Sequence, residues 1–221
     1  MSHARAHFQR VTAARAAATA PPGQTLTDCS EYELMLAKLA EDRRRLKQVQ
    51  STEGKAELKR HLLPDYAAWV DGVLQAGQGH QDAVLTSIMV WRIDAGDYHG
   101  ALDIAAYALP HKLTLPDQYQ RPLATLVAEE IADAAKRARD GKQPFDPEIL
   151  QRTAELTSDE DMFDQVRAKL HKELGLLLDS FDKAAALSHL QRAMQLHDKV
   201  GVKKDIERLQ RDMKNTGADG A

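Results

Sequence analysis

The residues of this chain best suited to a function are a cluster of Lys and Arg side chains, which can bind phosphate groups. Seven of them fall within residues 43–60, on two consecutive predicted helices: Arg43, Arg44, Arg45, Lys47, Lys55, Lys59 and Arg60. Each cation held near a DNA phosphate releases counterions and strengthens binding at low salt. Aromatic residues do not interleave with this cluster, so base stacking on a single strand is not indicated. The alternative is a solvated helix face, in which these cations pair with Glu41, Asp42, Glu53 and Glu57.

Two groups of carboxylates are candidates for a metal-dependent nuclease: Asp94 with Asp97, and Asp159 with Glu160 and Asp161. A nuclease of this kind holds its cations near the scissile phosphate with clustered carboxylates. Adjacent acids on a helix point in different directions, and the first pair falls in a predicted turn. The sequence therefore assigns no catalytic residue and no metal ligand.

No other motif predicts a cofactor. The short run Gly77-Gln78-Gly79 is followed by His80 and lacks the Lys-Ser/Thr ending of a phosphate-binding loop. The nine histidines are scattered, and only His3 and His7 have the i,i+4 spacing of a helical zinc site. The single Cys29 cannot form an internal disulfide, which favours a reducing cytoplasm.

Composition favours helices and an uneven distribution of charge. Of the 221 residues 29% are charged and 5% aromatic, and no run approaches the roughly 20 apolar residues of a membrane helix. Residues 1–60 hold eleven Lys/Arg against seven Asp/Glu, so they carry +4 and the remainder carries −7. The strongest acidic block is 146–164, with seven acids and one base. A basic N-terminal part can bind a polyanion, and an acidic remainder of the chain can bind a basic protein surface.

The stretch 91–109 predicts the turn and second helix of a tetratricopeptide-like helical hairpin. Gly96 can end the first helix, because it adopts a left-handed conformation without a Cβ clash. Small residues one heptad apart, Ala101 and Ala108, allow a neighbouring helix to approach closely, and a leucine at Gly100 is expected to hinder that approach. A second, degenerate copy is predicted downstream, where a shift of 85 residues places Ala101 on Ala186. The alternative is an ordinary helical domain in which small-residue packing recurs by chance.

The predicted architecture is all-α, with two helical clusters. It comprises a flexible basic segment (1–25), an N-terminal helical domain for DNA binding and oligomerisation (26–110), a linker (111–122), a C-terminal helical domain (123–214) and a disordered tail (215–221). Within the C-terminal domain, Asp146 and Pro147 predict the start of a short helix. Ser158 with Asp161 predicts the cap of the next one, which runs to Leu178.

A series of short sequence motifs, taken in their order along the chain, resembles a known family. They are Tyr32-Glu33, Met35-Leu36, Lys38-Leu39, Leu62-Leu63-Pro64, Trp69-Val70, Gly72-Val73-Leu74, Trp91-Arg92, Gly96-Asp97, Gly100-Ala101-Leu102, Tyr107-Ala108-Leu109, Val166-Arg167-Ala168-Lys169-Leu170-His171-Lys172 and His189-Leu190-Gln191-Arg192-Ala193. Over residues 3–213 the chain resembles the small terminase subunit, also called the terminase endonuclease subunit, of temperate contractile-tailed phages of the peduovirus group.

The resemblance implies a role in packaging viral DNA into a preformed capsid in the host cytoplasm. Small terminases recognise double-stranded viral DNA and recruit or regulate a large subunit that carries the ATPase and nuclease, and they assemble as homo-oligomeric rings. Some relatives carry a Lys/Arg-rich tail after the position of Lys214, whereas this chain has a short acidic to neutral end at Ala221. The expected DNA contacts therefore move to Arg5, Arg10 and Arg15 and to the cluster 43–60, while the 146–164 block or the 166–213 helices would meet the large subunit.

Two alternatives stay open beside this interpretation. The first is a metal-dependent DNA endonuclease in its own right, as the family's second name suggests. The second is a helical protein-binding scaffold that makes no contact with DNA. Cleavage of DNA with added metal would favour the first, and the absence of a DNA shift at any ionic strength would favour the second.

Overall fold

The computed structural model describes residues 7, 8, 10–12 and 30–218, and their regular elements are helices, without a β-strand. The all-α prediction is confirmed for this part of the chain. The chain divides into two units, residues 1–123 and 124–221. Arg5, Arg15, most of the predicted segment 1–25 and the last three residues lie outside the described residues.

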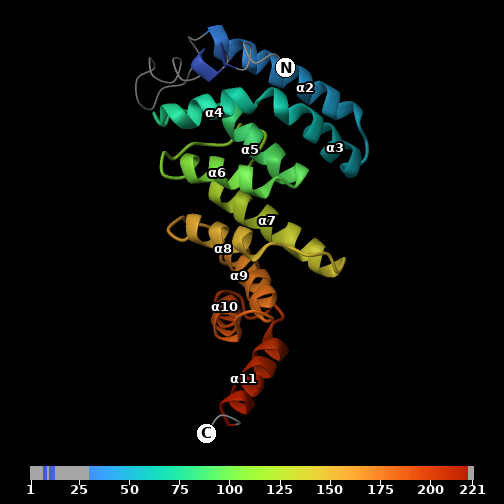
Figure 1. Cartoon of the computed structure of the whole chain (residues 1–221), viewed down its shortest axis with the longest axis vertical. Coiled ribbons are helices and arrows are strands. Elements are labelled where there is room, and N and C mark those ends of the chain that lie inside the picture. The colour runs from blue at the N-terminus through green and yellow to red at the C-terminus, as the bar shows by residue number, and fades with distance from the viewer. Residues whose placement is uncertain (1–6, 9, 13–29, 219–221) are drawn as a thin grey trace. The chain divides into compact units, whose positions relative to one another are not determined.

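From Ser30 onward, the first unit holds five α-helices and a 3-10 turn (Figure 1). They are α2 (Ser30–Gln48), α3 (Thr52–Leu62), η1 (Leu63–Asp65), α4 (Ala67–Ala76), α5 (Ala83–Ala95) and α6 (Tyr98–Ala108). Helix α5 packs against α2, α3, α4 and α6, and ten of its thirteen residues are buried. A helix that is apolar on every side is typical of such a central position.

Capping side chains fix the ends of α5 and α6. Asp82 accepts hydrogen bonds from the amides of Val84 (2.8 Å) and Leu85 (2.9 Å) and from Trp69 Nε1 (2.9 Å), which anchors the start of α5 in the core. Gly96 ends α5 at φ +85°, as predicted, and Asp97 caps α6 through the amide of Gly100 at 3.1 Å. The α5–α6 hairpin is therefore built from cap, glycine turn and cap.

The interior stripe of α6 is confirmed. Ala101 and Ala108 are fully buried at one-heptad spacing, and Leu102 and Ala105 between them are fully buried as well. The expected effect at Gly100 needs a different reason, because a Cβ added there would meet the guanidinium of Arg92 and the carboxylate of Asp97 rather than a neighbouring helix. The nearest atom is the far end of the flexible Arg92 side chain, so we expect a substitution at Gly100 to be less disruptive than the sequence indicated.

The second unit is a run of five helices in its described part. They are α7 (Leu123–Asp140), which starts at the unit boundary, α8 (Pro147–Leu156), α9 (Asp164–Leu178), α10 (Lys183–Leu196) and α11 (Lys203–Ala218). Helix α9 packs on α8 and α10, and α10 packs on α11. Two ion pairs attach α7 to α9, between Arg139 and Glu173 (2.9 Å) and between Lys169 and Asp133.

The α9–α10 pair shares with the first hairpin an aspartate that caps its second helix. Asp182 caps α10 through the amides of Ala184 (3.0 Å) and Ala185 (2.9 Å). Gly175 faces α10 closely, since an added Cβ would lie 2.7 Å from Leu190 Cδ2 and 3.0 Å from the Ala186 carbonyl oxygen. A small residue is therefore required where the two helices touch. The likeness to tetratricopeptide packing itself stays a prediction.

Two predicted boundaries differ from the structure. Ser158 and Asp161 do not cap α9, which begins at Asp164, because residues 157–160 form turns that follow α8 and the Arg167 guanidinium holds their carbonyl groups. The tail predicted to be disordered from residue 215 is helical as far as Ala218, where α11 ends.

The connection before the second unit is attached to the first. Gln81 and Thr114 exchange two hydrogen bonds of 2.8 Å, and Leu113 is buried. The linker role predicted for 111–122 stays a prediction. Among the described residues, no helix has the length and apolar character needed to cross a bilayer.

Candidate nucleic-acid interface

Helices α2 and α3 carry the predicted cationic cluster and meet at a tight joint. The Ser51 hydroxyl caps α3 by accepting a hydrogen bond from the Gly54 amide at 3.1 Å. The cap stops α2 from continuing into α3 and places the last turn of one helix beside the first turn of the other. The cations divide into groups with different surroundings around this joint.

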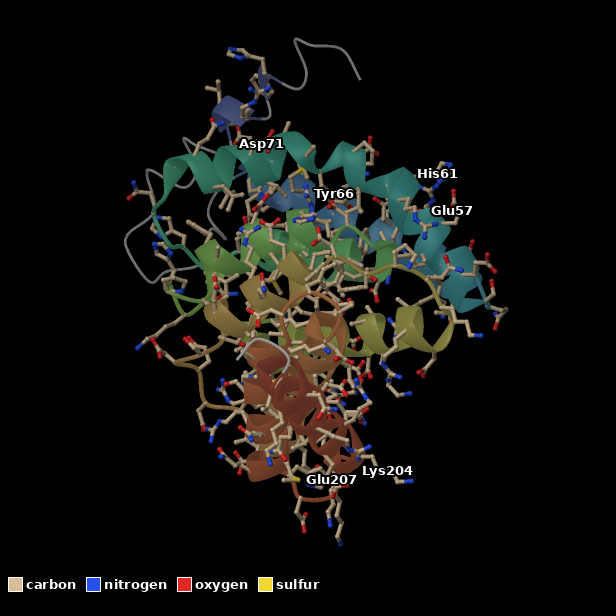
Figure 2. All side chains as sticks on the ribbon, turned by 60° about the horizontal axis from the view of Figure 1, so that its bottom comes forward. Glu57, His61, Tyr66, Asp71, Lys204 and Glu207 are labelled. Carbon is tan, nitrogen blue, oxygen red and sulfur yellow. The ribbon has the colours of Figure 1, made fainter. Side chains whose placement is uncertain are left out.

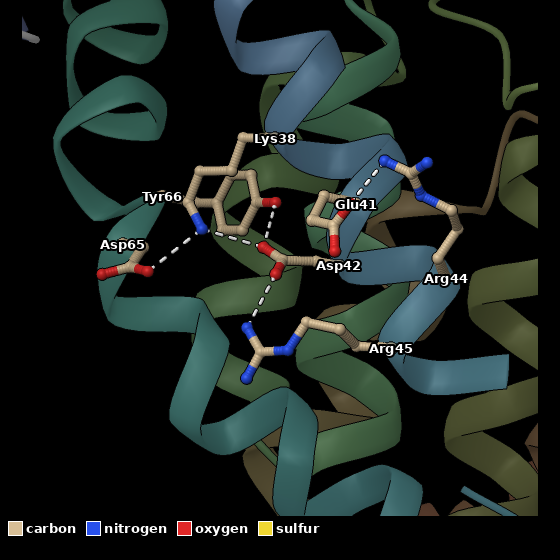
Figure 3. A network of polar contacts seen from close by, with 7 residues as sticks. All are labelled: Lys38, Glu41, Asp42, Arg44, Arg45, Asp65 and Tyr66. Carbon is tan, nitrogen blue, oxygen red and sulfur yellow. Dashed lines mark hydrogen bonds and ion pairs between the residues drawn. The ribbon is translucent and has the colours of Figure 1, made fainter. Parts of the chain in front are cut away.

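Asp42 is the centre of a polar network that the sequence did not reveal (Figure 3). The residue is 2% exposed, and its carboxylate accepts hydrogen bonds from Lys38 Nζ (2.8 Å), the Tyr66 hydroxyl (2.8 Å) and Arg45 Nη1 (3.0 Å). Burial by itself would raise the pKa of Asp42, but hydrogen bonds from Lys38, Tyr66 and Arg45 outweigh it and lower that pKa. The network ties α2 to the segment after α3, and Arg45 belongs to it.

The consecutive arginines 43–45 do not form one patch. Arg43 is half-buried and donates a hydrogen bond of 2.7 Å to Ser87 Oγ on α5, so it joins α2 to the central helix. Arg44 is 70% exposed and pairs with Glu41, whereas Arg45 turns toward Asp42. Successive helical residues point about 100° apart, which separates the three side chains.

Lys59 and Arg60 attach α3 to the end of α5. The Lys59 side chain is 14% exposed and pairs with Asp94, and Arg60 Nε donates to the Ala95 carbonyl oxygen at 3.0 Å. Arg60 also pairs with Glu57, which projects outward beside His61 (Figure 2). The alternative of intramolecular ion pairs is confirmed for Glu41, Asp42 and Glu57.

Lys47 and Lys55 are the cluster members whose side chains form neither an ion pair nor a hydrogen bond with another described residue. Lys47 is exposed in the last turn of α2, and Lys55 is half-buried in the first turn of α3. With the exposed Arg44, they lie around the α2–α3 joint. Arg45 and Arg60 are exposed as well, but they pair with Asp42 and Glu57. Arg10 is also exposed, whereas Arg5 and Arg15 lie outside the described residues.

Of the carboxylates considered as metal ligands of a nuclease, one pair has structural partners and the other group lies in an exposed loop. Asp94 pairs with Lys59, and Asp97 caps α6 and pairs with Arg92 at 3.0 Å. Asp159 and Asp161 are exposed in the loop before α9. Over residues 30–218 and the few described before them, no three His, Cys, Asp or Glu side chains converge as a metal site would require.

Comparisons with known proteins bear on both units. A sequence family described as the phage small terminase subunit matches residues 36–165. The chain is 50% identical over 214 residues to a protein of Escherichia phage P2 named "Terminase, endonuclease subunit", covering 96% of this chain and 86% of that protein. It is 25% identical over 197 residues to the "Probable terminase, endonuclease subunit" of Haemophilus phage HP1, covering 82% and 70%. No solved structure matches the chain.

Proposed function

Because the chain belongs to the phage small terminase subunit family, we propose that it recognises double-stranded viral DNA and recruits or regulates the large terminase subunit during packaging of the genome into the capsid. The 50% identity to the phage P2 protein over nearly the whole chain carries this proposal. The protein would work as a homo-oligomeric ring in the cytoplasm of the host cell.

The α2–α3 joint is the proposed surface for DNA phosphates. Lys47 and Lys55 offer unpaired positive charges there, and Arg44 adds an exposed one whose partner, Glu41, is exposed too. The other cations of the cluster are held by acidic side chains or by α5. Phosphate contacts position a protein on a duplex without reading its sequence. Recruitment of the large subunit is the second part of the function, and the 146–164 block or the 166–213 helices are its candidate surface.

A mobility-shift experiment with the full chain tests DNA recognition. Duplexes of the phage's own packaging site and of unrelated sequence are compared at low salt, with and without Mg²⁺. We expect tighter binding of the packaging-site duplex, and uncut DNA in every lane. No shift at any ionic strength by a well-folded protein would support the scaffold alternative instead.

The name of the P2 relative favours a second candidate, a DNA endonuclease in its own right. Cleavage of the duplex by the purified chain with Mg²⁺ or Mn²⁺ would support this candidate. Loss of cleavage in Asp94→Ala with Asp97→Ala, or in Asp159→Ala with Asp161→Ala, would then assign the metal site. A matched Glu41→Ala variant, which removes an exposed carboxylate elsewhere, should keep that activity.

A further inference from the structure

Phe163 occupies a position that neither capping nor packing explains. It is 73% exposed and stands at the N-cap of α9, where its side chain makes no capping hydrogen bond. Ser, Thr, Asp and Asn are the residues favoured there, because their side-chain oxygens accept a hydrogen bond from the first turn. A residue that breaks a local rule without a structural gain points to function.

The loop that carries Phe163 is held in place. Arg167 donates hydrogen bonds to the carbonyl oxygens of Thr157 (3.1 Å) and Glu160, and the Phe163 carbonyl oxygen accepts from the Val166 amide at 2.9 Å. The phenyl ring is therefore presented by an ordered loop, which reduces the entropy lost when a partner covers it. Exposed carboxylates flank the ring on both sides: Asp159, Asp161 and Asp164.

A groove of about 350 Å³ opens near the other end of the same helix. Its apolar lining comes from α7, the α7–α8 connection and the end of α9: Ala135, Pro144, Phe145, Leu176, Leu177 and Phe181. Phe181 is 72% exposed, so one wall of the groove is left partly uncovered. A bidentate pair from Arg139 to the buried Glu173 (2.9 and 3.2 Å) fixes α7 against α9 and gives the groove a defined shape.

The two features carry opposite charge. The groove lies beside the end of α7, where the exposed cations are Lys136, Arg137, Arg139 and Lys142. Lys136 pairs with Asp140 and Arg139 with the buried Glu173, so Arg137 and Lys142 supply the excess positive charge. The Phe163 loop carries carboxylates only, at residues 159, 160, 161 and 164. Complementary potentials of this kind steer association and fix its register.

The ring and the groove cannot meet within one molecule. Fourteen residues of α9 separate position 163 from position 177, which is about 21 Å at the helical rise of roughly 1.5 Å per residue. An apolar projection and an apolar groove at opposite ends of one element favour a head-to-tail contact, which closes into a ring or continues as a filament.

We propose that Phe163 of one copy inserts into the groove lined by Leu176, Leu177 and Phe181 of the next copy, with its flanking carboxylates facing the cations at the end of α7. This interface rests on the self-assembly part of the proposed function, and it names the surfaces that part requires. It does not depend on DNA recognition.

A mixing experiment with full-length variants tests the interface. Phe163→Ala removes the projection, and Phe181→Glu places a carboxylate on the groove wall at a position exposed enough to leave folding intact. Each variant alone should self-associate at least about tenfold more weakly than the unaltered protein, as measured by light scattering over a concentration series. Mixed together, they should form a one-to-one dimer, because one retains the groove and the other retains the phenyl ring.

Leu34→Ala is the matched control, because Leu34 is 70% exposed on α2 in the domain 26–110, for which the sequence predicted oligomerisation. If the second unit supplies the contact, this variant should assemble as the unaltered protein does, and weaker assembly would place the interface in the first unit and overturn the proposal. Assembly of Phe163→Ala equal to that of the unaltered protein, or no dimer on mixing, would overturn the interface while leaving self-assembly standing. An unaltered protein that stays monomeric would overturn self-assembly itself, and the mobility shift scores DNA recognition separately. Loss of large-subunit binding by Phe163→Ala with unchanged self-association would assign the ring to that partner and overturn the proposal.

Discussion

At the scale of residues, neighbouring side chains of like charge make different contacts. Arg43 is bound to Ser87, Arg45 completes the Asp42 network, and Arg44 stands in solvent beside Glu41. Changing all three together would therefore weaken the packing of the first unit as well as its attraction for DNA. The accessible set of Arg44, Lys47 and Lys55 gives a cleaner test of the DNA surface.

Asp42→Ala should destabilise the first unit by about 2–4 kcal/mol, because it leaves Lys38, Tyr66 and Arg45 without their shared partner. Denaturant unfolding followed by circular dichroism measures this change. Since the pKa of Asp42 is lowered in the folded protein, its contribution is present above the unfolded pKa of about 3.9 and is lost as the pH falls through the folded value.

Glu41→Ala is the control for this prediction. Its carboxylate also pairs with an arginine of the same helix, but the pair is exposed and should contribute less than about 1 kcal/mol. Equal effects of the two substitutions would show that burial does not distinguish these two pairs.

The His171–His189 contact predicts a pH dependence in the second unit. The two Nδ1 atoms lie 3.0 Å apart, and burial, followed by the proximity of His189, Arg167 and Arg192, lowers the pKa of His171 to about 4. The unfolded chain then binds more protons between about pH 6.5 and pH 4, so stability is full above this window and falls as the pH decreases through it.

We expect a loss of about 1–2 kcal/mol across this window, after allowance for screening by solvent. His171→Gln should remove most of it, as measured by urea unfolding at a series of pH values. A profile of His171→Gln that matches the unaltered protein would contradict the assignment of this pH dependence to His171.

At the scale of elements, the closeness of α9 and α10 depends on Gly175. Gly175→Ala should cost about 1–3 kcal/mol, because the added methyl group meets Leu190 and the fixed backbone oxygen of Ala186. Gly100→Ala should cost less, since the nearest atom there is the guanidinium of Arg92, which can move aside. Unfolding curves of the two variants compare these costs, and the reverse order would refute the proposed difference in packing.

A second prediction at the scale of elements concerns DNA binding at the α2–α3 joint. Arg44→Ala with Lys47→Ala and Lys55→Ala should weaken DNA binding and make the plot of log K against log salt shallower, by about 0.9 for each phosphate that the variant no longer neutralises. Lys203→Ala with Lys204→Ala and Arg211→Ala removes the same charge from exposed positions of α11 and is the control. Equal salt dependence in both triple variants would exclude the joint as the DNA surface.

The sequence predicted elements where local chemistry determines them. The cap at Asp146, the end of α5 at Gly96 and the buried stripe of α6 all follow from residue type and spacing. The predicted start of α9 was wrong, because the side chain of Arg167, which follows within α9, holds the carbonyl groups of the preceding turns. The Asp42 network and the groove were missed for the same reason, since both need segments that only the fold brings together.

At the scale of the whole molecule, the proposed DNA surface belongs to the first unit and the proposed assembly surface to the second. Family membership rests on both units, since the family match covers residues 36–165. Several copies bound to one duplex would add their phosphate contacts, because the second contact becomes intramolecular once the first has formed. Weak binding by a single copy is therefore compatible with tight binding by the assembly.

The decisive measurement for a DNA-binding ring is the mass of the full-length protein, determined by light scattering at low salt with and without a duplex of the packaging site. We expect a species of many subunits that takes up the duplex and leaves it uncut in the presence of Mg²⁺. A small species that degrades the duplex with added metal, or an assembled protein that ignores the duplex at every salt concentration, would contradict the proposed function.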